Sequence, residues 1–175
     1  TLGIPNYEVD DITDPTNGIL IHRHANSMGE PIATIRVNIG NIPRRNGTIP
    51  PHLIPLVIDE IPILSIYGLF TTGELRVTHA TELRVKESDR IKTIVAMIAE
   101  LGGQIKELDD GFTLSGSPQH HIPRDVHIQP QFDHRIVMSS IIASLASQTP
   151  IQISDIDCIK TSFPNFMALV QSLYK

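Results

Sequence analysis

The sequence predicts an α+β fold, in which helices pack on short-stranded sheet. Two observations predict this class. Apolar residues recur at helical spacing in several separate segments, and the segments between them carry the alternation and turn signals of short strands. The sequence has no run of long parallel β–α units and no glycine-rich phosphate loop, so a layer of helices and sheet is the best interpretation.

Composition limits the class of protein further. The chain has 175 residues, 41% of them hydrophobic, which suits one compact domain with a core. Its net charge of −5 argues against a broad nucleic-acid-binding surface. No apolar run reaches membrane-spanning length, the first residues lack a signal-peptide pattern, and a single cysteine excludes an intrachain disulfide. We therefore expect a cytoplasmic protein that binds neither nucleic acid nor membrane.

The N-terminal third contains two expected strands. Residues 1–17 are polar and broken by glycine and proline, so we expect an irregular lead-in that ends at the turn signal Asn17-Gly18. Residues 19–22 and 33–37 have strand patterns. Residues 41–55 hold four prolines and one glycine, which predicts an extended loop.

A buried helix is expected next. Residues 61–70 are apolar nearly all round, and Pro62 is acceptable in a first helical turn because that turn has no N–H bonds to lose. Residues 74–78 predict a short strand, and residues 82–85 repeat its Glu-Leu-Arg-Val pattern.

An amphipathic helix is predicted from Ser88, a good N-cap residue, to about Gly102, a good stop. Its apolar positions recur at a spacing of three and four, at Ile91, Ile94, Val95, Ile98 and Leu101. Residues 104–108 and 111–115 then predict a hairpin around Asp109-Asp110-Gly111.

The C-terminal third repeats the alternation of strand and helix. We expect short strands at 125–128 and 151–153, separated by a helix that begins at Asp133. A last helix is predicted to be capped by Ser162, with Pro164 in its first turn.

Four expected helix starts carry unusual side chains: Asp59-Glu60, Lys86 to Arg90, Asp133-His134-Arg135 and Lys160-Thr161-Ser162. Taken singly, each has an ordinary explanation. The aspartates and serines are good caps, Arg90 could pair on the surface with a neighbouring acid, and His134 could be a simple capped-turn histidine.

Repetition of cations at helix starts favours a binding site. An arginine in a first turn opposes the helix dipole, and two separate starts have one. If packing brings the starts together, Lys86, Arg90 and Arg135 form a cluster beside the carboxylates Asp59 and Glu87. Such a cluster would bind a doubly charged anion and offer an acid and a base. The histidines of the chain lack a cysteine or carboxylate complement, so we expect no metal site.

These motifs resemble, in order and approximate spacing, the C-terminal half of the 5-enolpyruvylshikimate-3-phosphate synthase family (3-phosphoshikimate 1-carboxyvinyltransferases). The matching stretches are Ile58-Asp-Glu-Ile-Pro-Ile-Leu64, Glu82-Leu-Arg-Val-Lys-Glu-Ser-Asp-Arg90, Asp133-His-Arg135 and Ser162-Phe-Pro-Asn-Phe166. The resemblance covers about residues 50–175 and is most specific over residues 82–90.

The resemblance implies a fold and a reaction. The family has two domains of repeated βαβαββ units, with helix N-termini aimed at the cleft between them. The chain would be a single partial C-terminal domain, residues 1–175, without the family's N-terminal domain. The implied reaction moves the enolpyruvyl group of phosphoenolpyruvate onto the 5-hydroxyl of shikimate 3-phosphate. It passes through a tetrahedral intermediate, releases phosphate and needs no metal or organic cofactor.

The resemblance also assigns roles to individual residues. Asp59 matches the aspartate that takes the proton from the 5-hydroxyl, and Glu87 matches the glutamate that handles the proton at the methylene carbon. Lys86 matches the lysine beside the substrate hydroxyl and the intermediate. Arg90 and Arg135 match the pair that binds phosphoenolpyruvate, as the forked guanidinium allows.

Two further residues are expected to have supporting roles. His134 matches the histidine of the Asp-His-Arg motif. Lys160 stands one residue earlier than the family lysine that directly precedes Thr-Phe-Pro, because Thr161 occupies that place here.

Since half of the cleft is absent, we expect the chain alone to be inactive and to need the missing N-terminal domain in cis or in trans. Two alternatives stay open. The related transferase that acts on UDP-N-acetylglucosamine shares the fold, although residues 82–90 argue against it. A non-catalytic, anion-binding fold relic is the other.

Overall fold

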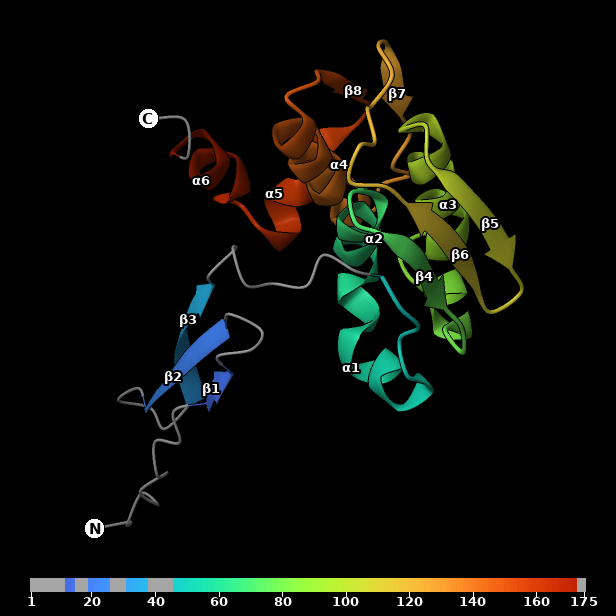
Figure 1. The fold of residues 1–175 in the computed structure, drawn as a ribbon. Helices are drawn as coiled ribbons and strands as arrows, with labels where there is room; N and C mark the ends of the chain where they lie inside the picture. Colours follow the sequence, from blue (N-terminus) through green and yellow to red (C-terminus); the bar gives the residue numbers. More distant parts are fainter. Residues whose placement is uncertain (1–11, 15–18, 26–30, 38–45, 173–175) are drawn as a thin grey trace. The chain divides into compact units, whose positions relative to one another are not determined.

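The computed structural model describes residues 12–14, 19–25, 31–37 and 46–172 (Figure 1). The chain divides into two compact units, residues 1–44 and 45–175. The sequence was expected to form one domain; the two units are described separately below.

The first unit contains a three-stranded antiparallel sheet. Its strands are β1 (Ile12–Asp14), β2 (Ile19–Ala25) and β3 (Pro31–Val37), in the order β1-β2-β3. The two expected strands are confirmed and are longer than predicted. The irregular structure predicted for residues 1–17 is wrong at β1, which pairs with β2. The predicted turn at residues 17–18 lies outside the described residues.

The main sheet of the second unit confirms the predicted hairpin. It comprises β4 (Gly73–Val77), β5 (Gln104–Leu108) and β6 (Gly111–Gly116), antiparallel in the order β4-β6-β5. Thr48 adds an isolated parallel bridge to Arg76 of β4. The remaining strands, β7 (Val126–Ile128) and β8 (Ile151–Ile153), form a parallel pair.

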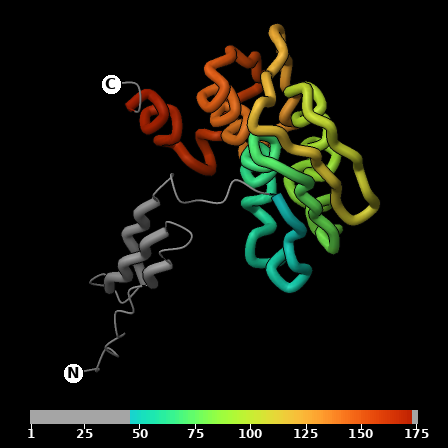
Figure 2. The backbone as a smooth tube through the Cα atoms, in the orientation of Figure 1, coloured from blue at the N-terminus to red at the C-terminus, as the bar shows by residue number. Residues whose placement is uncertain are grey.

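Six α-helices are described: α1 (Ile54–Val57), α2 (Ile61–Leu69), α3 (Arg90–Glu100), α4 (His134–Ser147), α5 (Ile159–Ser162) and α6 (Phe166–Ser172). Helices α2 and α3 pack against the main sheet, and α4 packs against both of them (Figures 1 and 2). The core lies between these elements. The helical spacing predicted for α3 is confirmed, because Ile91, Ile94 and Ile98 are fully buried.

The extended loop predicted for residues 41–55 is wrong from Pro51 onward. Pro51–Leu53 forms a 3-10 turn that leads into α1, and a second 3-10 turn, Ile58–Glu60, leads into α2. Prolines occupy early positions of η2 (the Pro51–Leu53 turn), α1 and α2, where the missing N–H costs nothing.

This apolar helical segment also corrects the expectation about membrane-spanning length. Pro51–Leu69 has 19 residues and a window of mean hydropathy 1.4, enough by length and composition to cross a membrane. Core helices pass the same test. Because Ile61 and Leu69 are fully buried and α2 packs against α4, we interpret the segment as a core element of the folded domain.

Three of the four predicted caps, Asp59, Ser88 and Ser162, do not cap the expected helices. Helix α3 is capped by Asp89, whose side chain accepts a hydrogen bond from the Lys92 backbone N–H, and the predicted cap Ser88 lies one residue before it. Asp59 lies inside a 3-10 turn, and α2 has no side-chain cap. The cap predicted at Asp133 is confirmed.

The last helix does not begin at Ser162. That residue ends α5, and α6 begins at Phe166. Phe163 between them has an extended backbone (φ −147°, ψ 74°), because a residue that precedes proline is disfavoured in the helical region.

Candidate active site

Arg90 lies at the centre of a cluster formed by three helix starts. Its side chain is 0% exposed. Nε donates to Asp133 Oδ2 at 2.8 Å, Nη1 donates to Asp59 Oδ1 at 2.9 Å, and Nη2 donates to the Glu87 carboxylate. Burial would lower the pKa of Arg90, but its hydrogen bond to Asp133 and the charges of Asp133 and Glu87 raise it. The guanidinium is therefore a buried cation held by three carboxylates.

Asp133 connects the starts of α3 and α4. Its side chain is 0% exposed and, besides Arg90, accepts from Ser88 Oγ at 3.1 Å and from the Arg135 backbone N–H at 3.0 Å. The sequence predicted only its capping role. The contact with Arg90 spans 43 residues and follows from the packing of α3 against α4, so no local pattern could have indicated it.

Asp59 lies near three cations, Arg90, Lys86 and Arg135. Its Oδ1 lies 3.9 Å from Lys86 Nζ, its Oδ2 lies 3.5 Å from Arg135 Nη2, and its backbone oxygen accepts from Arg135 Nη1 at 2.9 Å. Burial acts to raise the pKa of Asp59, but the charge of Arg135, the hydrogen bond from Arg90 and the charge of Lys86 lower it below its usual value. Asp59 is therefore ionised at neutral pH, as a general base must be.

Lys86 lies between two acids. Its Nζ donates to Glu82 Oε1 at 2.8 Å and faces Asp59 on the other side. The hydrogen bond to Glu82 raises the pKa of Lys86, burial acts to lower it, and the charge of Asp59 adds to the rise. Lys86 keeps its positive charge at the edge of the cluster.

His134 and Lys160 differ in their proximity to the cluster. His134 Nδ1 lies 4.0 Å from Glu87 Oε1, which brings His134 to the edge of the cluster but beyond hydrogen-bond distance. The Lys160 side chain is 76% exposed and pairs with Asp157 at 2.6 Å. Within the described residues, no hydrogen bond or ion pair joins Lys160 to the cluster. Its supporting role stays a prediction.

A cavity of about 280 Å³ opens beside the cluster. Asp59, Glu60 and Arg135 form its polar side, and the Arg135 Nη1 atom lies 3.5 Å from Glu60 Oε1. The other wall is mainly apolar and consists of Ile63, Met138, Ser139, Ile142, Phe163 and Phe166. A small ligand in this cavity would have a cation and a carboxylate within reach.

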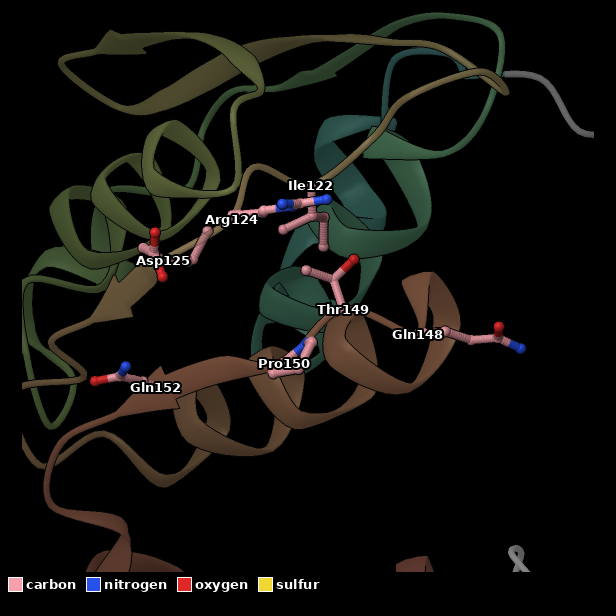
Figure 3. A pocket seen from close by; sticks show the side chains of 8 residues that line it. Ile122, Arg124, Asp125, Gln148, Thr149, Pro150 and Gln152 are labelled. Atoms are coloured by element: carbon pink, nitrogen blue, oxygen red, sulfur yellow. The ribbon is translucent and has the colours of Figure 1, made fainter.

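A second, larger cavity lies elsewhere in the same unit. It measures about 480 Å³ and is lined by residues around the starts of β7 and β8 and the end of α4, including Arg124, Asp125, Gln148 and Thr149 (Figure 3). It contains none of the predicted site residues. Over the described residues, no group of three or more histidine, cysteine, aspartate or glutamate side chains could hold a metal ion.

The structure thus gathers five predicted residues from three separate motifs into one cluster of cations and carboxylates: Asp59, Lys86, Glu87, Arg90 and Arg135. The model of the EPSP synthase (3-phosphoshikimate 1-carboxyvinyltransferase) family matches residues 11–169. The chain belongs to this family.

Individual relatives agree with the family match. The chain is 38% identical over 167 residues to a 3-phosphoshikimate 1-carboxyvinyltransferase of Hyphomonas neptunium, which covers 95% of this chain and 37% of the relative. It is 41% identical over 143 residues to a 3-phosphoshikimate 1-carboxyvinyltransferase of a Thermotoga species, a match that covers 81% of this chain and 33% of the relative. A solved structure of EPSP synthase from Acinetobacter baumannii matches with a TM-score of 0.78 and 32% identity, covering 90% of this chain and 37% of that one. The chain therefore spans about a third of the length of these relatives.

Proposed function

We propose that this chain is part of an enzyme that transfers the enolpyruvyl group of phosphoenolpyruvate to the 5-hydroxyl of shikimate 3-phosphate and releases phosphate. The observation that carries the proposal is one cluster, in which Arg90, Arg135 and Lys86 lie around Asp59 and Arg90 also pairs with Glu87. A reaction of this kind needs positive charge for a phosphorylated carboxylic acid and carboxylates for two proton transfers.

The proposed roles follow from charge and position. Arg135, which is 28% exposed, and Arg90 bind phosphoenolpyruvate through their forked N–H groups. Asp59, ionised and partly exposed, takes the proton of the 5-hydroxyl. Glu87 delivers a proton to the methylene carbon of phosphoenolpyruvate and takes it back when phosphate leaves. Lys86 offsets the negative charge that develops beside Asp59.

A chain that spans about a third of its relatives supplies one wall of such a site. We infer that the other wall, with most contacts to shikimate 3-phosphate, comes from an N-terminal domain in the same polypeptide or added in trans. The chain alone should bind phosphoenolpyruvate weakly and turn nothing over, because the reactants must be held together in a closed site. A cytoplasmic location remains an expectation.

The test is a phosphate-release assay with phosphoenolpyruvate and either shikimate 3-phosphate or UDP-N-acetylglucosamine. We expect release with shikimate 3-phosphate only, and only when the N-terminal domain is supplied. Release with UDP-N-acetylglucosamine would reassign the acceptor. A folded two-domain protein that releases no phosphate would leave the chain as a non-catalytic anion binder, and full turnover by the 175-residue chain would contradict the need for a second wall.

A further inference from the structure

We propose that Asp59 and Glu87 are exchangeable partners of Arg90, which give way to the substrate anion when it binds to the guanidinium. This inference rests on the proposed function and adds a step to it. Substrate binding would itself release the two carboxylates that take part in proton transfer.

The first support is that Arg90 has two kinds of partner. Asp133 is 0% exposed and is also held by Ser88 and by the start of α4, so it stays in place. Asp59 and Glu87 are 43% and 45% exposed. A half-exposed carboxylate loses little free energy when it turns to water, whereas a buried one would leave an unpaired buried charge behind.

The second support is that Arg90 has no free side. Its Nε faces Asp133, its Nη1 faces Asp59, its Nη2 faces Glu87, and the side chain has no exposed area. An incoming anion therefore reaches the guanidinium only if a carboxylate leaves. A carboxylate or phosphate of the substrate offers the same kind of oxygen to the same fork, so the buried cation is paired before and after the exchange.

The third support is chemical. While Asp59 pairs with Arg90 and Arg135, its lowered pKa makes it a weak base. Once an anion takes over Arg90, Asp59 loses one of these stabilising partners and becomes a better proton acceptor. Asp59 would therefore become a stronger base only when the substrate anion is bound.

The alternative is that Arg90 is purely structural and that only Arg135 and Lys86 meet the anion. The two possibilities differ in what happens when a competing carboxylate is neutralised. If Glu87 competes with the ligand, its removal strengthens anion binding, and the gain depends on Arg90. If Arg90 is structural, neutralising Glu87 raises the affinity for the anion only by removing a nearby negative charge, and the gain does not depend on Arg90.

The experiment is a calorimetric titration of the 175-residue chain with phosphoenolpyruvate. We expect Glu87→Gln to bind about two- to fivefold more tightly than the wild type, the range set by an ion pair of intermediate exposure. In an Arg90→Lys background the gain should disappear. An equal gain in both backgrounds, or weaker binding by Glu87→Gln, would overturn the exchange.

A second measurement covers the case in which Arg90→Lys does not fold. In the wild-type chain, added phosphoenolpyruvate should shift the side-chain carboxyl ¹³C signals of Asp59 and Glu87 and leave that of Asp133 in place. Equal shifts at all three, or none at Asp59 and Glu87 while the ligand binds, would contradict the proposal. Turnover by the two-domain protein together with that result would reject the exchange and retain the proposed function.

Discussion

At the scale of single residues, the carboxylate of Asp133 is the buried counter-charge of Arg90. Its carboxylate meets the guanidinium, the Ser88 hydroxyl and the first turn of α4 with 0% of its own surface exposed. The sequence identified the members of the cluster correctly, because each belongs to a short motif. It did not indicate this linkage, which arises only when α3 and α4 pack together.

Asp133→Asn tests the linkage directly. Asparagine is as good a cap as aspartate, so α4 should still begin correctly, but Arg90 loses its buried counter-charge. We expect the free energy of unfolding in urea to fall by about 3 kcal/mol, as for other broken buried pairs. Asp89→Asn is the matched control, because Asp89 also caps a helix and pairs with the partly exposed Arg84. The control should lose no more than about 1 kcal/mol, and an equal loss in both variants would mean that Asp133 acts only as a cap.

The pKa of Asp59 gives a pH prediction at the same scale. Folding lowers the pKa of Asp59. Its ionised carboxylate therefore stabilises the folded protein at pH values above the pKa of the unfolded chain, about 3.9. This stabilisation is lost as the pH falls through the pKa of the folded state. The stability difference between wild type and Asp59→Asn should therefore be largest near neutral pH and shrink in acid. Thermal unfolding at a series of pH values measures it, and a difference that grows as pH falls would contradict the assignment.

Elements were predictable where a pattern repeats over several turns and unpredictable where context decides. The buried stripe of α3 and the β5–β6 hairpin were both expected. By contrast, the tetrapeptide Glu-Leu-Arg-Val forms strand β4 at residues 74–77 and part of a 3-10 turn at residues 82–85. In the strand its leucine and valine are both buried, whereas in the turn Val85 is 79% exposed. The same four residues follow two backbones because tertiary packing outweighs local propensity.

The close approach of β4 to the hairpin gives a prediction at the scale of elements. A Cβ added at Gly111 would lie 2.0 Å from the Val77 backbone oxygen, so Gly111→Ala must displace one strand from the other. We expect a loss of about 2–3 kcal/mol in the free energy of unfolding. At Gly47 no atom of the described residues lies within 4 Å of the added atom, so Gly47→Ala should change stability by no more than about 0.5 kcal/mol. Equal effects of the two substitutions would mean that the strands adjust without cost.

At the scale of the whole molecule, three helix starts of the second unit meet in one cluster of cations and carboxylates. The family could be predicted from sequence because four short motifs keep their order and approximate spacing. The course of the backbone through residues 51–60 and the break between α5 and α6 could not. In both places the position of a proline fixes where a helix can begin or end, and that position is used differently in different folds.

If this cluster performs the proposed chemistry, replacing Asp59 should stop turnover without unfolding the protein. The measurement is the kcat for phosphate release from phosphoenolpyruvate and shikimate 3-phosphate by the two-domain protein, as wild type and as Asp59→Ala. Loss of the general base should lower kcat by about 10²- to 10⁴-fold, with a folded protein by circular dichroism. A folded Asp59→Ala variant that keeps the wild-type kcat would contradict the account.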